Sequence, residues 1–479
     1  MSHRTGKDQG WRAFGSHNEM WSAALWKLGL LGSGALLSLA CVGCSGGSDE
    51  NSDMAAEAIE EPDRFPELEA AEPLDLKALQ SADKLGVAAH HGEFRAAYEF
   101  SPTTLERARD IFPHALYRVQ SYDELTQQYG EYTYYSITGP DVESSVAYLQ
   151  NKGKGKVTVR VKDLEAEINN SLGQAGASAF DERSVVIDFW RTNREWLVRW
   201  DGLLDQEVNV TGIGPYGLAR QEMRDDLLAS IEQVATDLKP EYMILGEDME
   251  QLWLKGESGK LDVYDAEWFA FLLFYQDAVA RIRSASPETR VGVGINWDVF
   301  VNQVSVEYGK LELGDAEGAG DVVPSEELLD RAFRGILLPL AEWGDVLTLR
   351  SYRAATDDAT WYYQFLRRLE ALYGEDIPVV WYDIGTPTDG SATAQRQRNY
   401  IDTFTEWNAG VNVEALFWGR LYNIDGADGS NQTITGRCKS LVEDTDKNFM
   451  LPRERCFDGL FDTIFNAKPG LLAMEEQVK

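Results

Sequence analysis

From about Lys84 onward, short apolar runs alternate with longer segments whose apolar residues recur at helical spacing. Helices are predicted at 220–239, 265–286, 325–343, 358–374 and 391–409. Eight apolar runs are predicted as strands: Leu85–His91, Lys156–Lys162, Ser184–Asn193, Tyr242–Asp248, Arg290–Trp297, Val346–Tyr352, Pro378–Gly385 and Ala415–Tyr422. Nearly continuous apolar strands that alternate with amphipathic helices indicate a parallel sheet covered on both faces.

Eight such strands predict an α/β protein with a (β/α)8 TIM barrel. The last six strands are clear, whereas Ala115–Gln120 and Glu131–Thr138 compete for the first two positions. The alternative fold is a doubly wound open sheet. That fold would favour a glycine-rich phosphate turn after the first strand, and the sequence contains no such motif.

The first 43 residues resemble a bacterial lipoprotein signal peptide. Basic residues precede an uncharged run, Leu28–Ala40, which is too short to span a bilayer, and Cys41 and Cys44 follow it. We favour Cys44 as the lipidated residue, because Cys41 is then removed and Cys438 and Cys456 remain as an even pair. Cys41 is the alternative anchor. We therefore expect a lipid-anchored protein of the cell envelope, at the outer membrane.

The domain organisation follows from these features. Residues 44–83 are rich in acidic residues, Ser, Gly, Ala and Pro, and are predicted as a disordered acidic tether. Residues 84–479 form the barrel domain. We expect a disulfide between Cys438 and Cys456 to close a C-terminal loop, as an oxidising compartment allows.

The charge balance limits the ligands. The chain of 479 residues has 45 Lys and Arg against 79 Asp and Glu, a formal net charge of -34. Nucleic acid is not expected as a partner, and the membrane is expected to be contacted only through the N-terminal lipid, because polyanions would be repelled. A neutral glycan is compatible with this charge.

Five segments of the predicted barrel carry motifs at strand ends and at the last helix: Lys239–Glu250, Gly344–Tyr352, Asp376–Thr388, Glu414–Gly419 and Asp458–Gly470. In order and spacing they resemble the fourth, sixth, seventh and eighth strands and the closing helix of retaining glycoside hydrolases with a (β/α)8 barrel, nearest to the galactanase-like families. The resemblance covers roughly 180–479. The resemblance implies an acid/base carboxylate after the fourth strand and a nucleophilic carboxylate after the seventh.

The catalytic positions depart from the family pattern. The family's Asn-Glu pair is Glu247-Asp248 here, and the family's nucleophilic Glu is Asp383. Each catalytic side chain is one methylene shorter, which widens the gap between the carboxyl groups by roughly 2–3 Å in total. Retaining catalysis with a shifted backbone, single displacement through a water, and loss of catalysis all stay open.

Aromatic residues near strand ends are typical of a sugar groove, since flat apolar sugar faces stack on aromatic rings. We expect Glu247 and the following aromatic residues to contact substrate: Trp190, Trp297, Tyr352, Trp381 and Trp418. Trp381 lies two residues before Asp383, so strand alternation predicts that both share a face.

Two functions are carried forward. The first is a surface glycoside hydrolase that acts on a neutral poly- or oligosaccharide through Asp248 and Asp383. The second is a catalytically inactive barrel that binds glycans or serves as an envelope scaffold. We expect a monomer. Neither a cofactor nor a metal is expected, since no HExxH or EF-hand calcium-loop motif is present.

Overall fold

The computed structural model describes residues 67–90, 102–120, 182–189, 197–201, 206–209, 218–254, 262–304, 326–352, 360–373, 377–386, 393–421, 459–461 and 466–479. All of them belong to one compact unit, Asp63–Lys479. No helix among them is long and apolar enough to cross a membrane.

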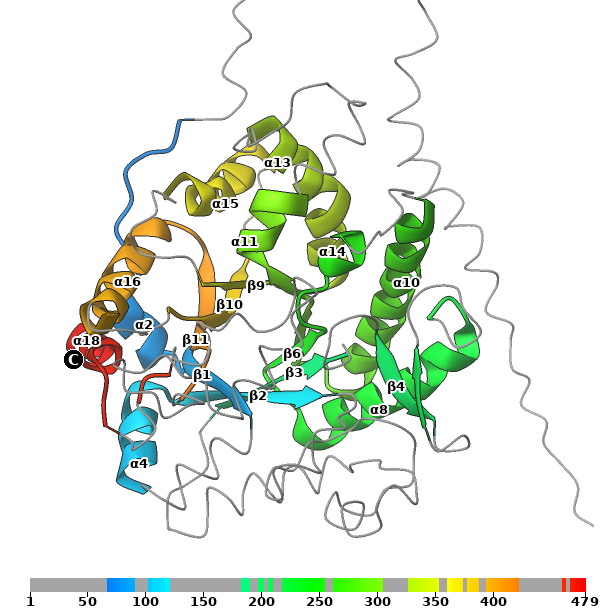
Figure 1. Ribbon diagram of the computed structural model, residues 1–479, viewed down its shortest axis with the longest axis horizontal. Coiled ribbons are helices and arrows are strands. Elements are labelled where there is room, and N and C mark those ends of the chain that lie inside the picture. Colours follow the sequence, from blue (N-terminus) through cyan, green and yellow to red (C-terminus); the bar gives the residue numbers. More distant parts are fainter. Residues whose placement is uncertain are drawn as a thin grey trace, which may run out of the picture. The chain divides into compact units, whose positions relative to one another are not determined.

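Nine parallel strands form the main sheet, in the order β7-β6-β3-β2-β1-β11-β10-β9-β8 (Figure 1). Their bounds are β1 Leu85–His90, β2 His114–Gln120, β3 Glu182–Asp188, β6 Tyr242–Leu245, β7 Arg290–Gly292, β8 Gly294–Asn296, β9 Leu347–Ser351, β10 Val379–Ile384 and β11 Val413–Trp418. The two ends of this order, β7 and β8, are consecutive in the chain and are separated only by Val293. The sheet therefore closes on itself with eight strand positions, as an α/β TIM barrel does.

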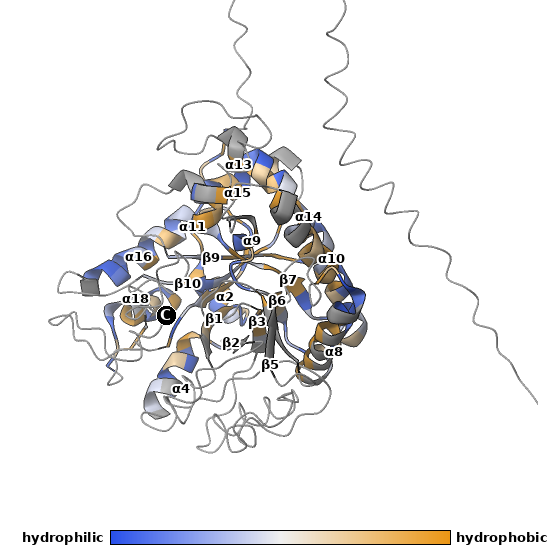
Figure 2. Ribbon diagram, turned by 45° about the vertical axis from the view of Figure 1, so that its right-hand side comes forward, coloured by the Kyte–Doolittle hydropathy of each residue, from blue (hydrophilic) through white to orange (hydrophobic). Residues whose placement is uncertain are grey.

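Helices cover the outside of the barrel (Figure 1) and carry apolar residues next to polar ones (Figure 2). They are α2 Leu76–Ser81, α4 Pro102–Ile111, α8 Gln221–Leu238, α9 Gln251–Leu254, α10 Asp262–Ala285, α11 Trp297–Val299, η1 Phe300–Val304, α13 Glu326–Ala332, η2 Phe333–Leu337, α14 Leu338–Trp343, α15 Thr360–Tyr373, α16 Thr393–Trp407 and α18 Pro469–Val478. A short antiparallel pair, β4 Val198–Asp201 and β5 Gln206–Asn209, stands apart from the main sheet. The five helical segments predicted from the sequence are confirmed within a few residues.

Side chains alternate along the strands between two apolar layers. One cluster fills the barrel interior, and the larger cluster lies between the strands and the helices. In β9, for example, Leu347 and Leu349 belong to the outer layer. Thr348 and Arg350 therefore point inward, which places an arginine inside the barrel.

The second barrel strand is formed by a different segment from the one predicted. β2 pairs directly with β1 on one side and with β3 on the other. The competing run at Ala115–Gln120 thus fills the second position, and the run Lys156–Lys162, which was predicted there, lies outside the described residues. A short apolar run does not show by itself which neighbours it will pair with.

The carboxyl-terminal part of the predicted tether is not disordered, in contrast to the sequence prediction. Asp75 caps α2 by accepting hydrogen bonds from the N–H groups of Lys77 and Ala78, and Leu76 and Leu79 of this helix are buried. Residues 69–83, expected to be disordered, are therefore ordered against the barrel. The predicted disulfide of Cys438 and Cys456 lies outside the described residues, as do the signal peptide and Cys44.

The amino end of the barrel contains a buried histidine. His114 is fully buried, with Nδ1 2.9 Å from the Asp83 carbonyl oxygen and Nε2 2.7 Å from Ser184 Oγ. Ser184 Oγ also accepts the Tyr242 N–H, so its own hydrogen is donated to Nε2, and we assign the proton on the ring to Nδ1. The ring packs edge-on against Phe417 at 4.8 Å.

Candidate active site

The turn after β6 carries Glu247 and Asp248 at the carboxyl end of the fourth barrel strand. Gly246 and Asp248 both have positive φ, 86° and 52°, and the left-handed conformation destabilises a non-glycine residue by roughly 1–2 kcal/mol. Gly246 donates to the Ile187 carbonyl at 2.8 Å and accepts from the Gly294 N–H at 3.1 Å. The turn is thus fixed to β3 and β8, with Glu247 and Asp248 buried.

Arg350 of β9 gathers the carboxylates of this turn and of β10. Its Nη2 donates to Asp248 Oδ2 at 2.5 Å, and its Nη1 lies 3.6 Å from Glu247 Oε2 and 3.9 Å from Asp383 Oδ2. Burial alone lowers the pKa of Arg350, but the negative charges around it, Asp248 foremost, raise that pKa above its ordinary value. The guanidinium is therefore a permanent positive charge between the carboxylates.

These contacts limit the distance between the two predicted catalytic carboxylates. The Nη atoms of one guanidinium lie about 2.3 Å apart, since each C–N bond is about 1.33 Å. The Oδ2 atoms of Asp248 and Asp383 are therefore no more than about 9 Å apart. Glycosidases hold their carboxyl groups about 5–5.5 Å apart for retention and about 6.5–9.5 Å apart for inversion.

A bulge in β10 turns Asp383 toward Arg350. Trp381 pairs with Leu349 and Asp383 pairs with Arg350, so Tyr382 is an extra residue on this strand. Residues paired across parallel strands share a face, and Asp383 therefore points inward while Trp381 points toward the helices. The prediction that Trp381 and Asp383 share a face is wrong, because it assumed regular alternation.

Gly419, just after β11, leaves space for Asp383 and Tyr352. A Cβ atom at Gly419 would lie 1.8 Å from Asp383 Oδ1 and 2.7 Å from the Tyr352 hydroxyl. These two oxygens are thus within about 4.5 Å of one another. The structure brings the predicted Tyr352 next to the predicted nucleophile.

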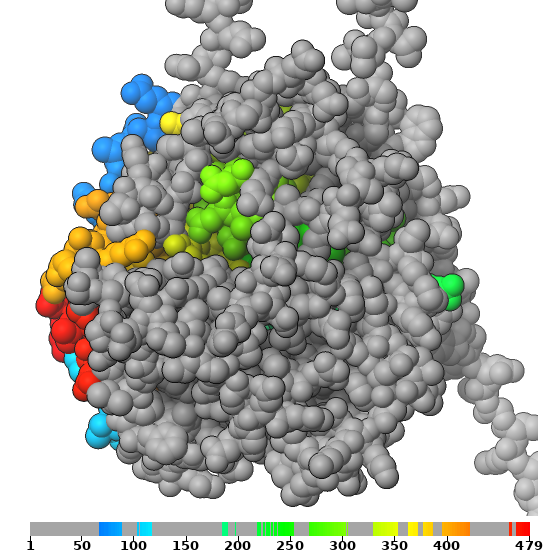
Figure 3. Space-filling view, viewed as in Figure 1, coloured from blue at the N-terminus to red at the C-terminus, as the bar shows by residue number. Residues whose placement is uncertain are grey.

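Asp298 of α11 fixes Tyr352 from the other side. Its carboxylate accepts the Tyr352 N–H at 2.8 Å and the Ser351 hydroxyl at 3.0 Å. Asp298 is partly exposed, and the segment of α11 and η1, bright green in the space-filling view, reaches the surface (Figure 3).

The predicted tryptophans do not line a groove. Trp297, Trp381 and Trp418 are at most 1% exposed and belong to the layer outside the sheet. Trp381 packs against Phe404 of α16 and donates from Nε1 to Asn408 Oδ1 at 2.8 Å. The prediction that these three tryptophans contact substrate is therefore wrong, because their side chains pack in the core. The fourth predicted tryptophan, Trp190, lies outside the described residues.

Glu250 is a further buried carboxyl group near the site. Its side chain is fully buried, Oε2 accepts the Asn296 N–H at 3.0 Å, and Oε1 has no hydrogen-bond partner within the described part of the chain. Burial, followed by the negative charge of Asp248, raises the pKa of Glu250 well above its ordinary value. The protonated form of Glu250 is therefore favoured more than that of a solvent-exposed glutamate.

Arg350, Glu250 and the space at Gly419 were not predicted from the sequence. A signal for Arg350 was present, because an arginine within an otherwise apolar strand needs a buried anionic partner. The bulge and the space at Gly419 had no such signal, since both depend on how neighbouring strands pair.

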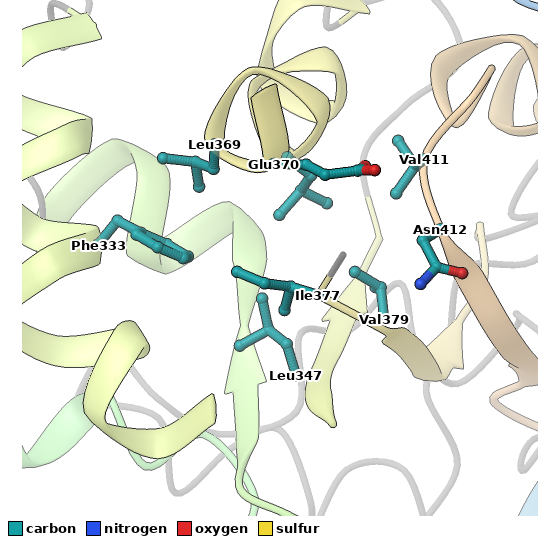
Figure 4. Close-up of a pocket in the computed structure, with 9 residues that line it drawn as sticks. Phe333, Leu347, Leu369, Glu370, Ile377, Val379, Val411 and Asn412 are labelled. Atoms are coloured by element: carbon teal, nitrogen blue, oxygen red, sulfur yellow. The ribbon is translucent and has the colours of Figure 1, made fainter. Parts of the chain in front are cut away.

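A separate pocket lies at the opposite end of the barrel (Figure 4). It is lined mainly by aliphatic side chains of η2 and α15 and of the starts of β9, β10 and β11, with Glu370 and Asn412 as polar members. It does not contact the carboxylates. Among the described residues, no three His, Cys, Asp or Glu side chains are grouped as metal ligands.

Comparison with solved structures returns glycoside hydrolases with barrel folds. The chain is similar to an exo-β-1,4-mannosidase from Opitutaceae bacterium strain TAV5 (14% identity, TM-score 0.45), with 82% of this chain and 58% of that chain covered. It is also similar to a family 39 glycoside hydrolase from Bacteroides cellulosilyticus WH2 (10%, TM-score 0.44; 86% and 65% covered). A third similar structure is xylanase 10B from Thermotoga maritima (13%, TM-score 0.43; 85% and 98% covered).

The chain thus spans about three fifths of the length of the first two proteins. No family model matches the sequence, and no curated protein matches it. At these identities the argument for function rests on the chain's own residues.

Proposed function

We propose that this protein is a glycoside hydrolase that acts on a neutral poly- or oligosaccharide, with Asp248 as acid/base and Asp383 as nucleophile or water-activating base. The observation that carries the proposal is the pair of contacts from Arg350 to Asp248 and Asp383. They bring carboxylates from the fourth and seventh strands together at the carboxyl end of the barrel, where barrel enzymes place their chemistry.

The charges suit a reaction with two carboxylates. Arg350 Nη1 places a positive charge 3.9 Å from Asp383 Oδ2, beside the carboxylate that would attack the sugar or activate a water. Tyr352 lies close enough to contact the same carboxylate or the sugar bound beside it. The distance limit of about 9 Å admits the retaining range and most of the inverting range, so the stereochemistry is left to experiment.

One observation favours the second candidate, a glycan-binding barrel without turnover. Asp248 Oδ2 accepts a hydrogen bond from Arg350 Nη2, and an oxygen engaged by a guanidinium is not available to pass a proton to the sugar. Catalysis through Asp248 therefore needs substrate to draw Arg350 away from it. In an inactive protein this ion pair would simply persist.

Anchoring at the cell envelope through a lipid on Cys44 is proposed on the sequence alone. It places the barrel at a surface where polysaccharides are accessible. Metabolic labelling with a fatty-acid probe tests it, since labelling that is lost in Cys44→Ser but kept in Cys41→Ser supports Cys44, and the reverse result overturns it.

Turnover separates the two candidate functions. The purified chain from Ser45 onward is incubated with aryl glycosides and with galactan, mannan and glucan polymers, and binding to the same polymers is measured in parallel. Release of reducing sugar supports the hydrolase, and NMR of the first anomer released decides between retention and inversion. Binding without release supports the inactive barrel and refutes the hydrolase.

A further inference from the structure

Glu250 is a buried titratable group that the proposed chemistry does not use. It follows Asp248 by two residues, is fully buried, and forms no ion pair within 4.0 Å among the described residues. An isolated buried carboxylate is strongly disfavoured unless it is paired or neutral. Its position therefore needs an explanation.

The side chain of Glu250 continues the contacts between β6 and β8. β6 ends at Leu245, and beyond it Gly246 accepts the Gly294 N–H while the Met249 N–H donates to the Gly294 carbonyl at 3.0 Å. The next available donor on β8 is the Asn296 N–H, and it reaches Glu250 Oε2. A side-chain oxygen thus takes the place of a backbone acceptor at this junction of the barrel.

Asp248 lies between these points of attachment. Gly246 and Met249 bond to β8 through their backbones on either side of Asp248, and Glu250 bonds to β8 through its side chain. Asp248 itself has a positive φ of 52°. Such a conformation persists only where the surroundings hold it, and the contacts on both sides do so here.

We propose that Glu250, as a neutral carboxylic acid, is a positioning residue that holds the turn bearing Asp248 against β8. Oε2 accepts the Asn296 N–H, and the proton resides on Oε1. The charged groups that act on Glu250 are Asp248 in its own turn and Arg350 of β9. Loss of the proton strengthens the hydrogen bond from Asn296 but places a second negative charge beside Asp248 in the buried turn, and the repulsion between the two carboxylates displaces Asp248.

This inference rests on the proposed hydrolase for its kinetic readout. Glu250→Gln keeps an acceptor for Asn296 and is neutral at every pH, whereas Glu250→Ala removes the acceptor. Glu406→Gln, an exposed change on α16, is the matched control. We expect Glu250→Ala to lower kcat by about 100-fold through misplacement of Asp248, with KM changed much less, and Glu250→Gln to recover most of that loss.

The dependence of activity on pH distinguishes this positioning role of Glu250 from a purely structural one. Activity of the wild type and of Glu406→Gln should fall on the alkaline side as Glu250 ionises, and in Glu250→Gln this fall should shift to higher pH. Superimposable profiles of wild type and Glu250→Gln would overturn the inference. So would Glu250→Gln being as impaired as Glu250→Ala.

Thermal unfolding separates this inference from the proposed function. Folding raises the pKa of Glu250. Its contribution to stability is therefore complete at low pH and is lost as pH rises through the pKa that Glu250 has in the folded protein. The Tm of the wild type should therefore fall with rising pH more steeply than that of Glu250→Gln. If no variant shows turnover, the hydrolase fails but this difference still decides the role of Glu250; equal slopes refute it.

Discussion

His114 makes the stability of this barrel sensitive to acid. Burial and, to a smaller extent, the nearby charge of Lys84 together lower the pKa of His114 from 6.5 to about 3, against the opposing effect of the hydrogen bond to the Asp83 carbonyl. The unfolded chain therefore binds a proton between these two values while the folded protein does not. Stability falls as pH decreases through that window.

The size of the effect follows from the shift. Each pH unit within the window changes the free energy of unfolding by about 1.4 kcal/mol, so lowering the pH from 7 to 5 should destabilise the protein by about 2 kcal/mol through His114 alone. The assay is urea unfolding at both pH values for wild type and His114→Gln. The glutamine can still accept the Ser184 hydroxyl hydrogen through Oε1, but it does not titrate.

The comparison between the two proteins isolates His114, because other groups titrate in both. The free energy of unfolding should change by about 2 kcal/mol less in His114→Gln than in wild type between these pH values. Glu241 Oε2 lies 3.5 Å from Nδ1, and if it stabilised a charged ring in the folded protein, the two proteins would respond equally. An equal response would refute the assignment of a neutral, buried His114.

Three further changes test individual contacts. Gly419→Ala should abolish turnover or glycan binding and lower the free energy of unfolding by about 1–3 kcal/mol, because its Cβ would overlap the buried Asp383 carboxylate; a fully active variant of unchanged stability would contradict the close approach. Asp75→Ala should lower the free energy of unfolding by about 1 kcal/mol through loss of the cap of α2, measured by urea unfolding, and no change would indicate that this segment is not ordered on the barrel. Trp381→Phe should destabilise the protein by about 1 kcal/mol by leaving Asn408 without its donor while sparing glycan binding, whereas selective loss of binding would restore Trp381 to a sugar groove.

The barrel was predictable because its signals are local. Six of the eight strands and the helices between them follow from apolar runs and helical spacing, and the carboxylates at the ends of the fourth and seventh strands follow from the position of each in its motif. The second strand was placed wrongly because several runs had equal propensity and only pairing with β1 and β3 selects His114–Gln120.

The details of the site depend on contacts between residues far apart in the chain. The bulge that turns Asp383 inward arises from its register with Arg350, and no local pattern marks it. The ordering of α2 arises from two leucines within an acidic segment, where the overall composition favoured disorder. The average composition of an acidic segment conceals the few apolar residues within it that contact the core.

The roles of Asp248 and Asp383 are tested by kcat/KM for wild type, Asp248→Asn, Asp383→Asn and the exposed control Glu406→Gln on the best substrate from the panel. We expect a loss of at least about 100-fold in each aspartate variant, with Tm retained and the control unaffected. Near wild-type turnover in Asp383→Asn would contradict the assignment of this carboxylate and, with it, the proposed chemistry.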